Sequence, residues 1–145
     1  MKIETKYHGE ITLEETSIMH FQNGLPGFIE EKKFVLLPLD SESPFMILQS
    51  IVTKDLGFIL VNPFQFFHSY EFELSAVDKE LLEIKEEKDV AVWTILTVKD
   101  PFVESTANLQ APVIFNIRNN VGKQVILNHT MYQTREKLFP EKIEK

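Results

Sequence analysis

The sequence predicts an all-β fold, either a small antiparallel barrel or a closed two-sheet sandwich, with one short helix inserted. Segments that alternate apolar and polar residues, or that are apolar throughout, recur along most of the 145 residues. Turn sequences separate these segments, and one stretch alone has the cap and the spacing of a helix. The length is that of a single domain, which we assign to residues 1–140, with a charged tail at 141–145.

Most of the chain is predicted to be β-strand. A hairpin of residues 3–7 and 10–13 opens the chain and turns at His8-Gly9. The segment 90–98 is apolar at both alternating sets of positions, which predicts a central strand, covered on both faces, with Trp93 buried in the main core. The other strands are predicted at residues 34–39, 45–52, 58–61, 113–117 and 125–127.

Short turn signals lie between these strands. Pro26 followed by Gly27 has the signature of a type II turn, which needs a φ of about −65° and then a positive φ. The segments 53–57 and 119–122 have the spacing of hairpin turns, and Asp100-Pro101 is a further break. Asn108 is expected to bond to nearby backbone and fix the entry to the strand at 113–117.

The helix is predicted to begin after Ser75. The Ser75 hydroxyl, with an acid three residues later at Asp78, approximates a capping box. The apolar residues that follow are spaced to share roughly one face: Val77, Leu81, Leu82 and Ile84. The last residues, 135–145, alternate in charge and are expected to fray.

The composition excludes several classes of function. The chain has no cysteine, which rules out disulfides, thiolate metal sites and cysteine nucleophiles. The net charge is −7 and basic residues are not clustered, so we expect no direct nucleic-acid binding and a basic protein as the natural partner. A polar start and the lack of a long apolar run predict a soluble, cytoplasmic protein with no membrane association.

No catalytic constellation is evident in the sequence. The serines lack a Gly-x-Ser-x-Gly motif, and the five glycines match neither a Walker nor a Rossmann loop. We therefore expect no catalytic residues, no cofactor, no metal and no small-molecule substrate. The histidines are too dispersed for a compact metal cluster, at His8, His20, His68 and His129.

Five aromatic residues are concentrated between residues 62 and 74. Tyr70 and Phe72 alternate with Glu71 and Glu73, which predicts a core-facing aromatic row on a strand with an acidic outer face. The three rings that precede them cannot all point inward from one extended segment, so one either caps the barrel mouth or is exposed as an interaction anchor. These three are Phe64, Phe66 and Phe67.

Five segments, in their order and spacing, form a specific pattern over about residues 3 to 140. They are Phe21-Gln22-Asn23-Gly24-Leu25-Pro26-Gly27-Phe28, Leu48-Gln49-Ser50, Asn62-Pro63-Phe64 with Tyr70-Glu71-Phe72, Thr106-Ala107-Asn108-Leu109-Gln110-Ala111-Pro112-Val113, and Gly122-Lys123-Gln124-Val125-Ile126-Leu127. This pattern resembles the bacterial flagellar assembly factor FliW family. Asn62 departs from the family, which has an aspartate before the proline, and the change affects only the chemistry of the turn.

The resemblance implies a function without catalysis. FliW-like proteins bind flagellin in the cytoplasm, and they bind CsrA, a small basic RNA-binding dimer that represses flagellin translation. Accumulating flagellin occupies the FliW-like protein and leaves CsrA free to repress. Once flagellin is exported, the released FliW-like protein captures CsrA and translation resumes. The implied partners are CsrA and flagellin, and no cofactor is implied.

We predict the CsrA-binding surface from acids that flank exposed apolar anchors. Glu71 and Glu73 would steer a basic dimer and repel RNA phosphates, and Asp100 would add charge at the Pro101 turn. An apolar anchor is needed for slow dissociation, because charges at a rim mostly affect association rates. This anchor is predicted to be Phe66 or Phe67.

A second hypothesis is a small-ligand or flavin-binding enzyme built on a split barrel. A flavin binder should show arginine, lysine or glycine positions that hold phosphate, and the arginines of the chain are limited to Arg118 and Arg135. Absorbance of the purified protein at flavin wavelengths would distinguish this hypothesis from protein binding.

Overall fold

The computed structural model describes residues 1–128 and 130–139 of the chain. In these residues one α-helix, α1 (Ala76–Leu81), lies among eleven strands. The strands are β1 (Lys2–Thr5), β2 (Gly9–Thr12), β3 (Ile18–His20), β4 (Lys33–Pro38), β5 (Met46–Ser50), β6 (Gly57–Val61), β7 (Val90–Thr97), β8 (Thr106–Ala107), β9 (Val113–Asn116), β10 (Val121–Gln124) and β11 (Glu136–Lys137).

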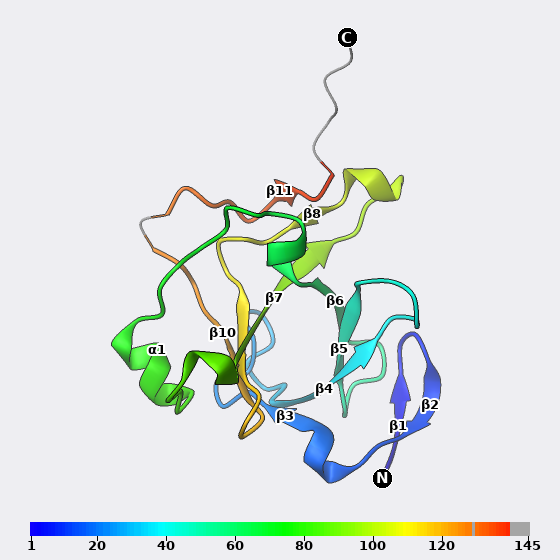
Figure 1. Ribbon diagram of the computed structural model, residues 1–145. Helices are drawn as coiled ribbons and strands as arrows, with labels where there is room; N and C mark the ends of the chain where they lie inside the picture. Colours follow the sequence, from blue (N-terminus) through cyan, green and yellow to red (C-terminus); the bar gives the residue numbers. More distant parts are fainter. Residues whose placement is uncertain (129, 140–145) are drawn as a thin grey trace.

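Seven of the strands close into a barrel. They follow the order β7-β6-β5-β4-β3-β10-β9, and β9 pairs back to β7 (Figure 1). All of these pairings are antiparallel except the short one between β3 and β10. The predicted all-β class with one short helix is confirmed, and the closed arrangement that the chain adopts is the barrel.

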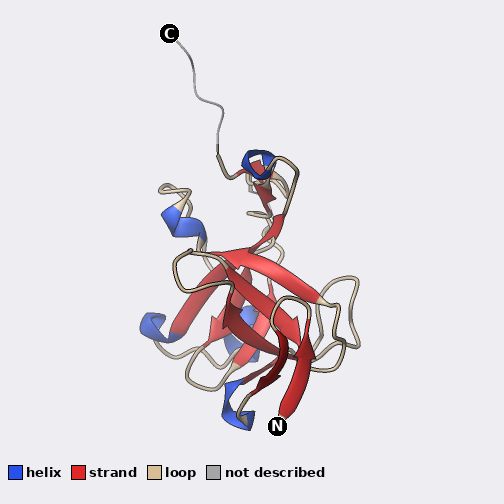
Figure 2. Ribbon diagram, turned by 90° about the vertical axis from the view of Figure 1, so that its right-hand side faces the viewer, coloured by secondary structure: helices blue, strands red, loops and turns tan. Residues whose placement is uncertain are grey.

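The remaining strands lie at opposite ends of the molecule. β8 and β11 continue the sheet beyond β7, and the β1–β2 hairpin forms a separate two-stranded sheet. Figure 2 shows the barrel strands between these two ends, with the N-terminus beside the hairpin. The hairpin predicted at the start of the chain is therefore confirmed.

The predicted strand at 125–127 is wrong. The strand that follows the turn at 119–120 is β10, which pairs with β9 and ends at Gln124. Residues 125–127 still lie along the chain before β9, since Val125 N–H bonds to Pro112 and Leu127 N–H bonds to Gln110. A regular ladder does not continue there, because Pro112 has no N–H to donate.

Helix α1 has the predicted start but not the predicted apolar face. The Ser75 hydroxyl accepts from the backbone N–H of Asp78 at 3.1 Å, which confirms the cap. Val77 and Leu81 are exposed, whereas Asp78 is buried against β10. The helix ends after six residues, and only residues beyond its end, Leu82 and Ile84, pack inward.

The main core of the barrel is aromatic. The ring of Phe21 meets those of Phe34 and Phe115 edge-on, with centroids 5.3 and 5.7 Å apart, and all three are buried. Trp93, predicted to be buried there, is instead half-buried and packs against this cluster. The coverage of β7 is incomplete because β6 pairs with it only at Thr94 and Ile95.

The end of the described chain is more ordered than its charge pattern suggested. β11 pairs with β8, and Leu138 is buried, so the fraying predicted from residue 135 onward is wrong for 136–138. A buried leucine and a strand partner outweigh the alternating charges. The predicted tail at 141–145 lies outside the described residues. No described helix is long and apolar enough to span a membrane.

Candidate functional site

Between β6 and α1 the chain leaves the barrel in an arm that begins with a single 3₁₀ turn at Pro63–Gln65. The side-chain oxygen of Asn62 accepts from the backbone N–H of Phe64 at 2.9 Å and caps this turn. Asparagine and aspartate cap helical turns in the same way. The departure at Asn62 from the FliW pattern therefore preserves the local structure.

Tyr70 fastens the arm to the body of the protein. Its hydroxyl donates to the carbonyl oxygen of Leu109 at 2.7 Å, and its ring meets that of Tyr132 with centroids 4.7 Å apart. Burial raises the pKa of the Tyr70 hydroxyl above its ordinary value of 10.0, and the electrostatic influence of Tyr132 raises it further. Tyr70 therefore stays protonated and keeps its hydrogen bond throughout the neutral range.

The next residues, 71–74, alternate as the sequence predicted, but they form no strand. Phe72 and Leu74 are half-buried, whereas Glu71 and Glu73 are exposed. The N–H of Glu71 donates to the Tyr132 hydroxyl at 3.0 Å. Within the described residues, no hydrogen bond reaches the backbone groups of Phe72, Glu73 or Leu74. Figure 1 shows this segment outside the barrel strands, running toward α1.

A groove of about 670 Å³ lies between this segment and the start of β7. Its apolar lining includes Phe64, Tyr70, Phe72, Val90 and Val92. Its polar lining has more carboxylates than amines: Glu71, Glu73, Glu86 and Glu87 against Lys79 and Lys85. The lining of the groove therefore combines apolar side chains with an excess of carboxylates over amines. A second hollow, of about 490 Å³, lies along the same segment, toward residues 125–128 and Thr130.

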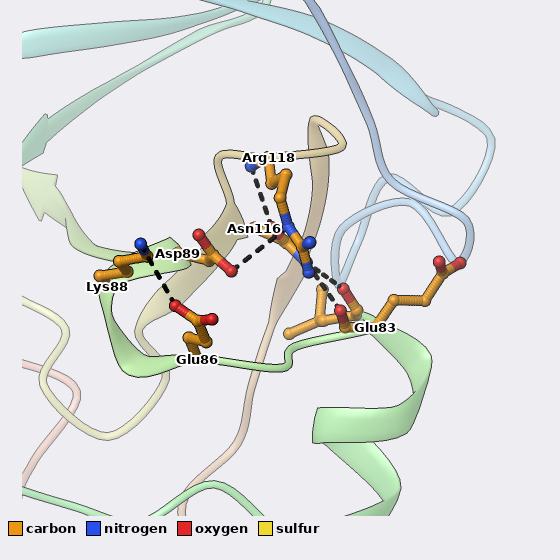
Figure 3. Close-up of polar contacts among 7 residues, drawn as sticks. Glu83, Glu86, Lys88, Asp89, Asn116 and Arg118 are labelled. Carbon is orange, nitrogen blue, oxygen red and sulfur yellow. Dashed lines mark hydrogen bonds and ion pairs between the residues drawn. The ribbon is translucent and has the colours of Figure 1, made fainter.

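The far wall of the groove is held in place from the β9–β10 hairpin. The Asn116 side-chain amide donates to the carbonyl oxygens of Leu82 and Glu83, and Arg118 pairs with Asp89 at 3.3 Å (Figure 3). The two Asn116 bonds satisfy carbonyls that the end of a helix leaves without partners, and the Arg118–Asp89 pair ties the start of β7 to the same hairpin. The chain from α1 to β7 is thereby attached to the barrel.

Helix α1 has a further attachment on its other side. Lys123 on β10 donates through its ammonium group to the carboxylate of Asp78, and both side chains are largely covered. Partial burial makes such a pair stronger than an exposed one, because water screens it less. The pair explains why Asp78, and not an apolar residue, faces the barrel.

Comparison with known proteins identifies the relationship that the motifs indicated. The model of the family described as "FliW protein" matches residues 2–138. The chain belongs to the FliW family. It is 56% identical to the "Flagellar assembly factor FliW" of Geobacillus kaustophilus over 145 residues, which is 100% of both chains. It is 50% identical to that of Bacillus subtilis over 141 residues, covering 97% of this chain and 99% of the relative.

A solved structure supports the same relationship. The "Crystal structure of the flagellar assembly factor FliW" has a TM-score of 0.94 to this chain at 53% sequence identity, covering 99% of this chain and 100% of that one. The resemblance to the FliW family, based on five sequence segments, is therefore confirmed. Of these segments, Phe64 and the stretch Tyr70-Glu71-Phe72 line one side of the groove.

The predicted partner-binding residues of this FliW family member lie in two places. Glu71 and Glu73 come together at the edge of the groove. Phe66 lies elsewhere, stacked on Phe45 with centroids 6.3 Å apart. Asp100 is exposed shortly before Phe102, whose ring also contacts Phe45. The single surface predicted from sequence is thus divided between the groove and an aromatic patch.

The predicted apolar anchor, Phe66 or Phe67, is not a fully exposed ring, and its role stays a prediction. Both are half-buried against the second core cluster, while Phe64 is 42% exposed and lines the groove. The 3₁₀ turn directs the two rings to different neighbours. The ring centroid of Phe64 lies 5.7 Å from that of Tyr70, on the groove side, and the ring centroid of Phe66 lies 6.0 Å from that of Phe139. The capping pair Asn62-Pro63 was the sequence signal for this helical turn.

The aromatic patch is a closed ring of four phenylalanines. Phe45 contacts Phe66 and Phe102, and Phe139 contacts the same two, with centroid distances from 5.5 to 6.3 Å. Phe102 and Phe139 are exposed. The patch therefore offers an apolar contact surface beside Asp100.

Groups that could hold a metal or a phosphate are not assembled in the described residues. No set of three or more histidine, aspartate or glutamate side chains is arranged there to hold a metal ion. Arg118, one of the two arginines considered for a flavin phosphate, is engaged by Asp89. His129 lies outside the described residues.

Proposed function

We propose that this member of the FliW family regulates flagellum assembly in the cytoplasm by binding two proteins in alternation, CsrA and flagellin, without catalysing a reaction. Flagellin occupies the protein while it accumulates and leaves CsrA free to repress flagellin translation. After flagellin is exported, the protein captures CsrA and translation resumes. This scheme is the one that the family resemblance implies.

The observation that carries the proposal is the acidic, apolar-lined groove beside the exposed ring of Phe64. A basic dimer approaching a protein of net charge −7 is attracted over a distance, and this raises its association rate. Once docked, it buries the apolar lining, which slows dissociation. Glu71 and Glu73 would contact CsrA directly and repel RNA phosphates from the neighbouring surface.

The aromatic patch supports a second contact. Phe66 is part of this patch, and Asp100 lies beside it. Phe67 packs against the same core cluster as Phe66. We propose that the exposed rings of Phe102 and Phe139 and the carboxylate of Asp100 meet the same partner as the groove. A contact at two separate patches is consistent with a partner that is itself a dimer.

Calorimetric titration of purified CsrA into the protein at two salt concentrations tests the proposal. Glu71→Lys is expected to weaken CsrA binding and to reduce its dependence on salt, because one attractive charge is replaced by a repulsive one. Glu10→Lys, an equal change of charge on β2, is the matched control. Added flagellin is expected to release CsrA. Equal affinities and equal salt slopes for the two variants would remove this face from consideration, and simultaneous binding of both proteins would contradict the alternation.

A further inference from the structure

We infer that residues 72–74 bind an extended segment of a partner protein by strand addition, and that this segment alternates basic and apolar side chains. The inference deepens the proposed function, on which it rests for the identity of the partner. The chemistry of the segment follows from the groove itself. It starts from the backbone of the arm, whose N–H and C=O groups at Phe72, Glu73 and Leu74 have no partner among the described residues.

The direction of these groups follows from a single hydrogen bond. In an extended chain, the backbone groups of successive residues point to opposite edges. The N–H of Glu71 points to the edge at Tyr132, because it donates to that hydroxyl at 3.0 Å. The groups of Glu73 therefore point the same way, and those of Phe72 and Leu74 point to the opposite edge, which borders the groove. Two residues thus present a donor and an acceptor each to whatever occupies the groove.

The side chains around the groove specify the occupant. A strand that pairs with 72–74 alternates its side chains between the same two faces as the arm. On the inner face, its apolar side chains would meet the lining formed by Val90 and Val92. On the outer face, its basic side chains would lie beside Glu71 and Glu73, which are exposed. Charge complementarity therefore favours a lysine- or arginine-bearing segment over an acidic one.

The groove also borders the start of β7, at an edge of the barrel sheet. β6 pairs with β7 only at Thr94 and Ile95, so the first residues of β7 have no strand neighbour on that side among the described residues. Main-chain pairing with an exposed edge is a recurring mode of peptide recognition, in which the backbone provides affinity and alternate pockets provide specificity. The arm provides such an edge, and the side chains of Val90 and Val92 at the start of β7 line the pocket beside it.

The test uses the full chain and a synthetic peptide, N-acetyl-Lys-Val-Lys-Val-Lys-Val-amide carrying a fluorescent label, with binding followed by anisotropy. Two isomers are compared, one with N-methyl groups on the three valines and one with N-methyl groups on the three lysines. Strand addition predicts that one isomer binds about tenfold more weakly than the other, because only one set of amides faces the arm. Weaker binding of the isomer with methylated valines indicates antiparallel pairing, and weaker binding of the isomer with methylated lysines indicates parallel pairing.

Equal affinities of the two isomers, at any level, would overturn strand addition.

A second experiment tests the charge of the bound segment. Glu73→Lys is expected to weaken binding of the unmodified peptide about fivefold. It should strengthen binding of the corresponding peptide that has glutamate in place of lysine. Glu10→Lys is expected to change neither. An unchanged preference in Glu73→Lys would overturn the alternation of basic side chains, and a dimer of the protein that excludes the peptide would show that a second copy occupies the groove instead.

The outcomes separate this inference from the proposed function. If the peptide binds with the predicted asymmetry but CsrA does not displace it, the groove is confirmed as a strand receptor and the choice of CsrA as its occupant fails. If CsrA binds while neither peptide isomer does, CsrA recognition stands and the strand receptor fails.

Discussion

The side-chain amide of Asn116, on β9, donates to the carbonyl oxygen of Leu82 at the end of α1 at 2.7 Å, although 34 residues separate the two. The same amide reaches the carbonyl oxygen of Glu83 at 3.0 Å, and its own oxygen accepts from the backbone N–H of Arg118. Asn116 is fully buried. One residue of the barrel therefore joins the end of α1 to the β9–β10 hairpin and positions the far wall of the groove.

Asn116→Ala is expected to lower the free energy of unfolding by about 2–3 kcal/mol, because it leaves buried carbonyl and N–H groups without partners. Urea denaturation measures the change. Asn119→Ala, in the exposed turn of the same hairpin, is the control and is expected to cost much less. Equal stabilities of the two variants would contradict the assigned role of Asn116.

Two glycines of one turn are predicted to differ in their tolerance of alanine. Gly24 and Gly27 both have a positive φ, of 64° and 83°, which an L-residue adopts at a cost of about 1–2 kcal/mol. A Cβ at Gly27 meets nothing within 4 Å, whereas one at Gly24 would lie 2.5 Å from the carbonyl oxygen of Ile29. Gly24→Ala is therefore expected to cost about 1–3 kcal/mol more than Gly27→Ala, since overpacking adds to the strain. Thermal melting of both variants checks this, and similar melting temperatures would contradict it.

Stability at alkaline pH is predicted to depend on Tyr70. The fold raises the pKa of this hydroxyl, so the protonated form is favoured in the native state. The stabilisation is fully present below pH 10 and is lost as the pH rises from there toward the native pKa, because the unfolded chain releases the proton first. Between pH 10 and 11, the free energy of unfolding should fall more steeply for the natural chain than for Tyr70→Phe, by at most about 1.4 kcal/mol per pH unit.

The control for this experiment is Tyr7→Phe, at an exposed tyrosine of the β1–β2 turn. It should retain the steep decrease of the natural chain. At neutral pH, Tyr70→Phe should also cost about 1–2 kcal/mol, since the carbonyl of Leu109 loses its partner. Parallel pH curves for Tyr70→Phe and the natural chain would show that Tyr70 contributes nothing to the pH dependence.

Asn108 is predicted to be architectural. Its side-chain oxygen accepts from the backbone N–H of Ala111 at 3.0 Å and holds the turn before β9. Asn108→Ala is expected to reduce stability by about 1 kcal/mol and to weaken binding of the two proposed partners, CsrA and flagellin, together. Chemical denaturation and binding titrations on one preparation check both effects. Loss of one partner alone, at full stability, would instead make Asn108 a contact residue.

The local structures were predictable because each depends on a few consecutive residues. The type II turn at Pro26-Gly27 is present, with the N–H of Phe28 bonded to the carbonyl of Leu25 at 2.7 Å. The cap of α1 at Ser75 and the alternation of residues 71–74 also agree with the sequence. Backbone preferences and side-chain spacing act within one turn or one strand, so the sequence alone contains this information.

The tertiary structure decided which of these local elements meet, and this determined the candidate site. The sequence placed Phe66 and Phe67 beside Glu71 and Glu73, but their exposure depends on rings brought from distant segments, such as Phe139. Asp78 is buried because β10 brings Lys123 to it. The groove likewise exists only where the arm passes the incompletely paired start of β7. Burial and strand pairing depend on contacts between residues that are far apart in the chain. Residue spacing therefore determined the local elements, whereas packing determined the surfaces that they form.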